Sequence, residues 1–166
     1  MIAIGKRAQQ LVLTAVAGAV ESILIQNGFL KSGNWEWQRR LEWRIDEVDL
    51  VVEEGLNSRL LPTFRVLLPR TKVSEFGEQY QHIAQINVAR LLRPDQGPHF
   101  EVRLPATTLG QDKLVDSVSS DINRALPWFQ QFATPELCRK NLERFLRIGC
   151  PAYLDAEHFL DSIISR

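Results

Sequence analysis

The sequence predicts an α+β fold: an N-terminal helix, an antiparallel β-meander of about five strands, and C-terminal helices packed on one face of the sheet. Apolar residues recur with the period of a helix at both ends of the chain and with the period of a strand across its middle third. The predicted strands are joined by short connections, which favours antiparallel neighbours. Because the 166 residues contain no linker or repeat, we expect a single α+β domain, residues 1–166.

The first helix is expected to extend from Lys6 to Gln26 and to stop at Asn27-Gly28, because glycine readily takes the left-handed conformation that closes a helix. Two basic residues before the apolar run, and Ala17-Gly18-Ala19 within it, also resemble a signal peptide. The apolar positions continue past Glu21, which favours an amphipathic or buried helix. Glu21 also interrupts the run too early for a membrane span.

Strands are predicted where apolar and polar residues alternate. Between Trp35 and Ile45 the apolar residues occupy odd positions, with Arg39 as the one inward exception. The phase shifts at Asp46-Glu47, where a slip of one residue would turn a continuous strand inside out. A turn or a bulge is therefore expected near Asp46, and a turn between two strands is preferred. The inward residues of the later strands are Val48, Leu50 and Val52, then Phe64, Val66 and Leu68, then Tyr80, Ala84, Ile86 and Val88, then Phe100, Val102 and Leu104.

Helical spacing returns between residues 114 and 132, and Pro127 is expected to kink this run or to split it at Leu126. Thr134-Pro135-Glu136 is a start signal for the next helix, which is expected to end at Gly149. Asp155 is expected to cap the last helix. The apolar stripe of that helix, which must be covered by something, comprises Phe159, Leu160, Ile163 and Ile164.

Three tryptophans, Trp35, Trp37 and Trp43, share the strand face that the first helix would cover, so core packing is preferred to ligand stacking. In the alternative, Trp35, Trp37 and His82 line a pocket between sheet and helices. That pocket would belong to a small-molecule-binding protein or a weakly recognisable hydrolase. His82 itself is in phase with apolar neighbours, which favours a hydrogen-bonded interior histidine.

The composition excludes several classes of function. Lys plus Arg and Asp plus Glu are both 20, so nucleic acid is not an expected partner. The chain has no phosphate-binding glycine loop, zinc-protease helix or G-x-S-x-G elbow. We therefore assign no cofactor, no metal and no catalytic residue. A zinc site from Cys138, Cys150 and His158, or a nucleophilic Cys138, is an alternative, but the two cysteines fit buried thiols in a reducing cytoplasm.

Charged residues alternate with the apolar ones and are expected to form the outward face of the sheet. One interpretation is a set of cross-strand ion pairs. The other is a surface that binds a protein partner, in which charges fix orientation. The residues assigned to this surface are Arg40, Arg44, Glu47, Asp49, Glu53 and Arg65. A homodimer through the last helix is a further option, and no membrane partner is expected.

Two motifs lie in stretches that bracket the predicted strands. The first helix ends in GF-x-K-x-G, at residues 28–33, and later strands read V-x-L-V-V and F-R-V-L-L before a LPWFQQFATPE stretch. This order resembles the bacterial domain-of-unknown-function family numbered 4304 over most of the chain. The resemblance implies a small, stand-alone bacterial protein and transfers no catalytic residue. We therefore expect a non-enzymatic protein-binding module, with immunity to a toxin as one version drawn from size and fold alone.

Overall fold

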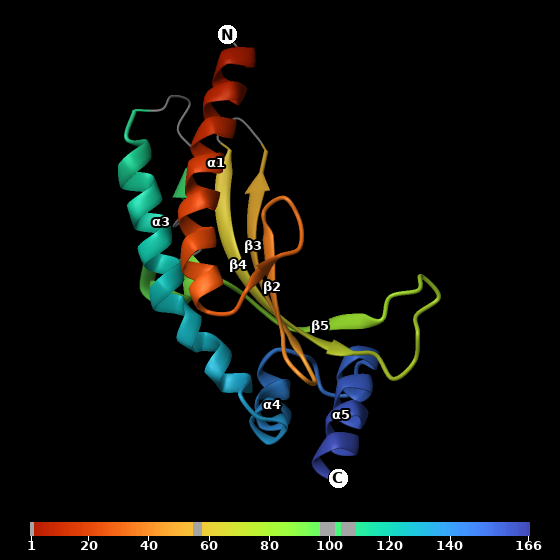
Figure 1. Ribbon diagram of the computed structural model, residues 1–166. Coiled ribbons are helices and arrows are strands. Elements are labelled where there is room, and N and C mark those ends of the chain that lie inside the picture. Colours follow the sequence, from red (N-terminus) through yellow and green to blue (C-terminus); the bar gives the residue numbers. More distant parts are fainter. Residues whose placement is uncertain (1, 55–57, 97–101, 104–108) are drawn as a thin grey trace. The chain divides into compact units, whose positions relative to one another are not determined.

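The computed structural model of the protein describes residues 2–54, 58–96, 102–103 and 109–166 (Figure 1). The predicted order of helix, sheet and helices is confirmed. The strands are β1 (Leu30–Lys31), β2 (Glu36–Arg40), β3 (Ile45–Glu53), β4 (Arg59–Pro69), β5 (Tyr80–Asn87) and β6 (Val102–Arg103). The helices are α1 (Ile2–Gln26), α2 (Val88–Leu92), α3 (Gln111–Ala125), α4 (Pro135–Asn141) and α5 (Pro151–Ile164), with short 3₁₀ turns η1 (Pro94–Gln96), η2 (Leu126–Phe132) and η3 (Leu142–Arg144).

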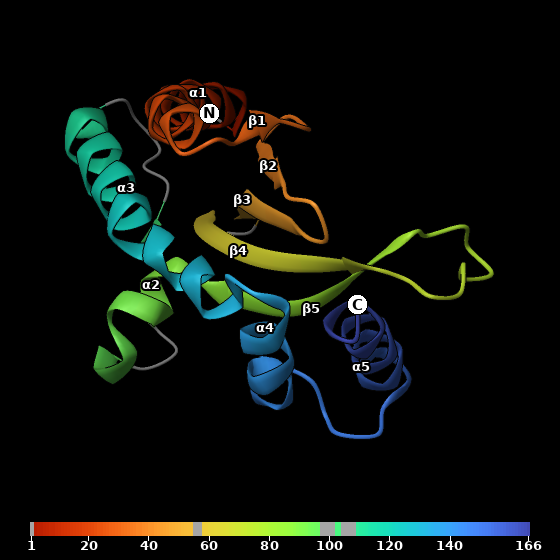
Figure 2. The same ribbon diagram turned by 60° about the horizontal axis from the view of Figure 1, so that its bottom comes forward.

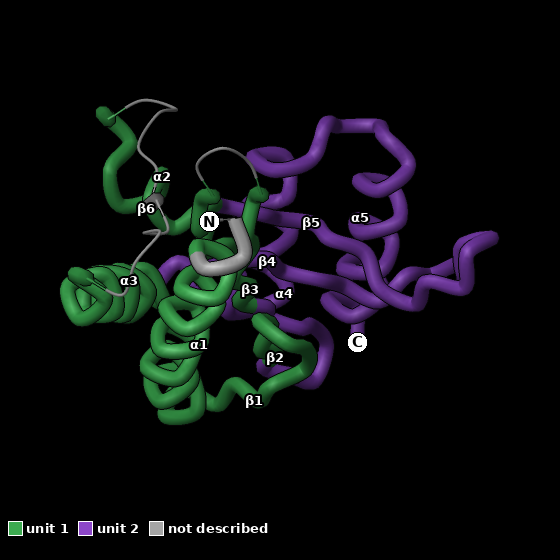
Figure 3. The backbone as a smooth tube through the Cα atoms, turned by 90° about the horizontal axis from the view of Figure 1, so that it is seen from above, with its two compact units in different colours: residues 1–38, 48–63, 87–126 green, residues 39–47, 64–86, 127–166 purple. Residues whose placement is uncertain are grey.

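The strands follow the meander order β1-β2-β3-β4-β5, and β6 also pairs with β4. Leu30 lies opposite Gln38 in the antiparallel β1–β2 pair, and Arg59 lies opposite Arg103 in the β4–β6 pair. The chain divides into two compact units, coloured in Figure 3. Unit 1 contains residues 1–38, 48–63 and 87–126, and unit 2 contains residues 39–47, 64–86 and 127–166.

Unit 1 is built on α1, which packs against α3. The predicted stop of α1 is confirmed, because Gly28 has a φ of 82° and the amide of Phe29 donates to Leu24 O at 3.0 Å. Trp37 is completely buried, and its indole N–H donates to the carboxylate of Glu21 at 3.2 Å. This tryptophan is therefore a core residue whose one polar atom is satisfied by α1.

Unit 2 centres on an aromatic cluster between β4 and the turn η2. Phe64 and Phe129 stack with ring centroids 4.9 Å apart, and Trp128 meets Phe129 and Phe132 edge-on at 5.2 and 5.1 Å. Each such contact adds about 0.5–1.5 kcal/mol beyond area burial. Helices α4 and α5, which belong to the same unit, pack against each other (Figure 2).

Local chemistry explains which predicted boundaries hold. As expected, α3 ends at Ala125 and Pro127 lies in the 3₁₀ turn that follows it. Thr134 caps α4, because its hydroxyl accepts a hydrogen bond from the amide of Leu137 at 3.2 Å. The expected end of this helix at Gly149 is wrong, since α4 stops at Asn141.

Two further expectations about helix starts are wrong. Cys150, not Asp155, caps α5, because its sulfur accepts from the amide of Tyr153 at 3.4 Å. Val88 opens α2 rather than continuing a strand, since the Asn87 side chain accepts from the Ala89 amide at 2.9 Å and ends β5. Of the last predicted strand, Val102 lies in β6, while Phe100 and Leu104 lie outside the described residues.

The turn expected near Asp46 lies earlier, at residues 41–44, so Trp43 stands in the turn and Asp46 is inside β3. The period-two rule assumes that charged residues face water. Asp46 breaks that assumption because it is completely buried. The prediction of inward-facing residues is confirmed further along the sheet at Val48, Leu50 and Phe64, which are buried.

Among the described helices, α1 alone is long and apolar enough to cross a membrane by length and composition. Its segment Gly5–Gln26 has a mean hydropathy of 1.5, and a third of the apolar window is buried inside the protein. The core helix of a soluble protein and a signal sequence meet the same criterion. A cytoplasmic location therefore stays a prediction.

Candidate interaction surface

Charged residues expected on the outside of the sheet lie inside unit 2. Arg44 and Glu47 are each only 4% exposed, so the expectation that they face solvent is wrong. Asp46 is completely buried and receives hydrogen bonds from Arg44 Nε at 2.8 Å and from Arg39 Nη2 at 2.7 Å. We call Arg39, Arg44 and Asp46 the buried ionic cluster.

The buried ionic cluster is fixed by aromatic and backbone neighbours. The Arg44 guanidinium lies 5.3 Å from the Trp43 ring centroid and donates to Phe129 O at 3.4 Å, while its Nη1 is buried with no hydrogen-bond partner. Arg39 lies 5.7 Å from the Phe129 ring centroid. Charges removed from water in this way must be held by each other, so the cluster specifies how unit 2 packs.

A second ion pair joins the buried Glu47 to the half-buried Arg65 at 2.9 Å, and Arg65 Nε donates to Gln85 at 3.1 Å. Among the remaining residues assigned to the surface, Arg40 is exposed and Asp49 is half-buried. Glu53 is exposed and lies 3.8 Å from Arg59, a separation at which an exposed pair contributes little. Three of the six assigned residues are therefore occupied in interior contacts.

The three residues of the alternative pocket differ in burial, and they do not all belong to the same unit. Trp37 is enclosed in unit 1, and Trp35 is half-buried, with its carbonyl accepting from the Leu50 amide at 2.8 Å. His82 belongs to unit 2 and is exposed, so the expected interior histidine is wrong. Strand β5 does not alternate cleanly there, because both Ile83 and Ala84 are buried.

Cys138 is completely buried in α4. Burial raises the pKa of its thiol from 9.0 to about 12, the charge of Arg44 lowers it, and the charge of Asp46 raises it. Such a thiol is a poor nucleophile. Among the residues that the structure describes, no three His, Cys, Asp or Glu side chains are arranged to hold a metal ion.

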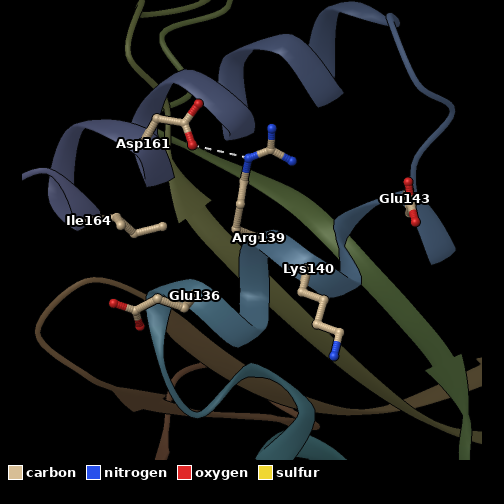
Figure 4. Close-up of a pocket in the computed structure, with 6 residues that line it drawn as sticks. All are labelled: Glu136, Arg139, Lys140, Glu143, Asp161 and Ile164. Atoms are coloured by element: carbon tan, nitrogen blue, oxygen red, sulfur yellow. Dashed lines mark hydrogen bonds and ion pairs between the residues drawn. The ribbon is translucent and has the colours of Figure 1, made fainter.

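An open hollow of about 600 Å³ lies at the surface of unit 2, between α4 and α5 (Figure 4). It is lined by Glu136, Arg139, Lys140, Glu143, Asp161 and Ile164. Arg139 is held by Asp161 at 3.1 Å, by the Tyr153 hydroxyl at 3.3 Å and by Glu157. In Figure 4, Glu136 and Lys140 extend away from Arg139 in different directions. The hollow therefore lacks the convergent groups of a catalytic site.

The loop between β4 and β5, residues 70–79, projects away from the helices of unit 2 in all three views (Figures 1–3). We call these residues the hairpin tip. It carries the most exposed apolar side chains of this unit: Phe76 is 84% exposed and Val73 is 70% exposed. Exposed large apolar groups gathered at one place are typical of contact surfaces.

Hydrogen bonds within the hairpin tip hold its conformation. The Gly77 amide donates to Ser74 O at 2.8 Å, and the Glu78 amide donates to the Ser74 hydroxyl at 3.1 Å. Gly77 has a φ of 74°, a value that side-chain-bearing residues rarely adopt. Below this turn, Arg70 donates from its amide to Gln79 O at 2.8 Å and pairs with Glu78 at 2.9 Å. The tip is therefore an ordered turn.

One carboxylate on α5 holds both strands at the base of the hairpin tip. Asp155 accepts from the Thr71 amide at 3.2 Å, from the Thr71 hydroxyl, and from Gln81 Nε2 at 2.8 Å. Thr71 precedes the tip's turn and Gln81 follows it, so this single side chain fixes the direction in which the tip leaves unit 2. Asp155 thus has a positioning role in place of the expected capping role.

Val73 and Phe76 were not singled out from the sequence. They occur in the stretch RTKVSEFGEQ, where polar residues and a glycine surround them. Two apolar residues in a segment of turn formers have no periodic partners, so no strand or helix face is available to bury them. That isolation was the signal, although it does not distinguish an exposed tip from a loop folded back on the core.

Comparison with known proteins adds no relative: no protein-family model, no curated protein and no solved structure matches the chain. The resemblance drawn from sequence motifs accordingly stays a prediction. The function must be argued from the surfaces of the two units.

Proposed function

We propose that the chain is a non-enzymatic protein-binding module that works in the bacterial cytoplasm. The observation that carries this proposal is that the hairpin tip has an exposed apolar side chain on a backbone turn that hydrogen bonds hold in place. Phe76 is held out in water by a hydrogen-bonded turn whose base is fixed by Asp155. An ordered apolar projection binds at a smaller entropic cost than a mobile one.

The charged surface assigned from the sequence supports binding less well than the hairpin tip does. Arg44 and Glu47 are buried and held by ion pairs, so they are not available to steer a partner. The exposed Arg40, which belongs to the same unit as the hairpin tip, can still contribute at the rim of an interface, where charges affect association rate more than affinity. Immunity to a toxin remains one version of this function.

The alternative of a small-molecule or hydrolase pocket has weaker support. Trp37 is enclosed and its indole N–H is already bonded to Glu21, which leaves it no polar group to offer a ligand. The expected homodimer through α5 also has a smaller apolar surface than its sequence implies, because Leu160 is completely buried within unit 2.

The proposal is tested by affinity capture followed by direct binding. The purified chain is immobilised, exposed to an extract of its source cells, and the retained protein is purified and titrated against the chain by calorimetry. A saturable one-to-one complex is expected. A chain that retains no such protein, and that instead turns over a substrate, would refute the binding-module proposal.

A further inference from the structure

We infer that the hairpin tip docks in a concave apolar pocket of another protein, with Phe76 as the side chain that fills the pocket. This inference rests on the proposed function, since it names the surface and the partner's chemistry. Of the seven described phenylalanines, four are buried and two are half-buried. Phe76 alone among them stands in water, at 84% exposure.

The geometry of the hairpin tip suits an anchor residue. Aromatic side chains at the centre of an interface commonly contribute most of its binding energy when they enter a well-packed pocket. Phe76 follows Glu75 in the turn that the Ser74–Gly77 hydrogen bond closes, so its backbone is set before a partner arrives. Val73, 70% exposed, precedes the same turn and widens the apolar surface.

A second copy of the chain does not supply the pocket. Two tips meeting face to face would bury roughly 600 Å² in total, if a Phe and a Val each contribute at the usual scale, whereas stable interfaces need about 1,200 Å² or more. The hollow between α4 and α5 has five charged residues and one isoleucine in its lining, so it does not match an apolar tip either.

The charges of the hairpin tip favour a protein pocket over a lipid surface. Glu75 adjoins Phe76 and Lys72 adjoins Val73, and both charged residues are exposed, while Arg70 is paired with Glu78, so the tip has no net charge. A tip without net positive charge is not attracted to anionic headgroups, and the carboxylate beside the inserting side chain is costly to bury in a bilayer. The same carboxylate is complementary to a basic residue at the rim of a protein pocket, which defines the partner as an apolar pocket with a basic edge.

The test places a photoreactive phenylalanine analogue at position 76 of the full chain and irradiates it in the source cells. The cross-linked protein is then purified and titrated against three chains: wild type, Phe76→Ala and Leu154→Ala. Leu154 is the matched control, since it is 51% exposed on α5 in the same unit. Circular dichroism checks that all three chains are folded.

We expect Phe76→Ala to weaken binding more than tenfold and Leu154→Ala to change it less than twofold. A fourth chain, Glu75→Lys, titrated in the same way, should bind several-fold more weakly than the wild type. If a protein binds all three chains equally, the inference about the tip is wrong while the binding-module proposal stands. If no protein binds any chain, both fail. Cross-linking to a second copy, or binding to vesicles of phosphatidylcholine and phosphatidylglycerol that Phe76→Ala abolishes, would also overturn the inference.

Discussion

The buried ionic cluster and the hairpin tip belong to the same unit and have opposite relations to water. Arg44 and Asp46 are charged and lie almost entirely inside, whereas Val73 and Phe76 are apolar and lie almost entirely outside. The common rule places charges outside and large apolar groups inside. Each exception is held by hydrogen bonds: the cluster by its own ion pairs, and the tip by its turn and by Asp155.

The two exceptions have different physical consequences. Removing charges from water costs several kcal/mol per ion before attraction is counted, so a buried pair contributes more to a unique packing than to net stability. Leaving an apolar side chain in water forgoes burial free energy of about 1.5–3 kcal/mol, which a partner's pocket can recover. The cluster therefore specifies how unit 2 packs, and the tip provides a surface by which unit 2 can bind a partner.

The largest expected effect comes from breaking the cluster. Asp46→Ala leaves Arg39 and Arg44 without the carboxylate that both contact, and we expect the free energy of unfolding to fall by about 3–5 kcal/mol in urea denaturation. Glu53→Ala is the control, because its pair with Arg59 is exposed and should contribute less than about 1 kcal/mol. Equal effects of the two changes would mean that the cluster is hydrated in solution.

A double change sharpens the same comparison. Replacing the pair together, as Arg44→Met with Asp46→Leu, removes the two most deeply buried charges and keeps the volume apolar, so part of the loss caused by Asp46→Ala should be recovered, while Arg39 still lacks its carboxylate. If the double variant is as unstable as the single one, attraction within the pair outweighs its desolvation, and the cluster is a net source of stability.

Much of the fold was predictable because α1, β4 and α3 bury faces with regular periods. Phe64, Val66 and Leu68 are all completely buried, as the alternation in β4 requires. The turn between β2 and β3 was misplaced because sequence patterns treat Arg44 and Asp46 as surface residues. Their opposite charges are two residues apart and meet locally, but only tertiary packing removes both from water, and single-sequence periodicity does not contain that information.

The candidate site was less predictable than the fold. Glu47 and Arg65 alternate with apolar neighbours, which indicates an outward face, yet they pair with each other, and Glu47 is buried in that pair. Phe76 departs from expectation in the other direction. A large aromatic residue normally suggests a core contact, whereas this side chain is exposed. Its exposure follows from the Ser74–Gly77 turn and from the distant Asp155, which lies on another element and leaves no mark near Phe76 in the sequence.

The next effect is a dependence of stability on pH that comes from Cys138, whose pKa is raised to about 12 by burial beside the cluster. Between pH 9.0 and about 12 the unfolded chain has lost this proton and the folded chain keeps it, so the free energy of unfolding falls as pH rises. The slope for one group is about 1.4 kcal/mol per pH unit, and below pH 9.0 this contribution is intact.

Urea denaturation at about pH 8 and about pH 10.5 measures this slope in the wild type and in Cys138→Ala. Other groups titrate in the same range, so only the difference between the two chains is informative. The wild type should lose more stability than the variant over the interval. Parallel losses would show that Cys138 ionises normally and that the region beside the cluster is accessible to water.

A smaller effect is expected where α5 holds the hairpin tip. Asp155→Ala removes the acceptor for Thr71 and Gln81, and we expect unfolding stability to fall by about 1 kcal/mol because the carboxylate is only partly buried. Amide hydrogen exchange at Thr71 should become faster at the same time. The control is Asp161→Ala, on the same helix as Asp155. It removes the contact with Arg139 of α4 and should leave the Thr71 exchange rate unchanged.

The smallest effect on stability is expected at the tip itself. Phe76→Ser should change the free energy of unfolding by less than about 0.5 kcal/mol, because the ring has little contact to lose. The matched change Phe64→Ala, in the buried aromatic cluster of the same unit, should cost about 3–5 kcal/mol. A substantial loss of stability in Phe76→Ser would mean that the tip folds back onto unit 2 in solution, and the contrast between an inward-facing cluster and an outward-facing tip would then no longer hold.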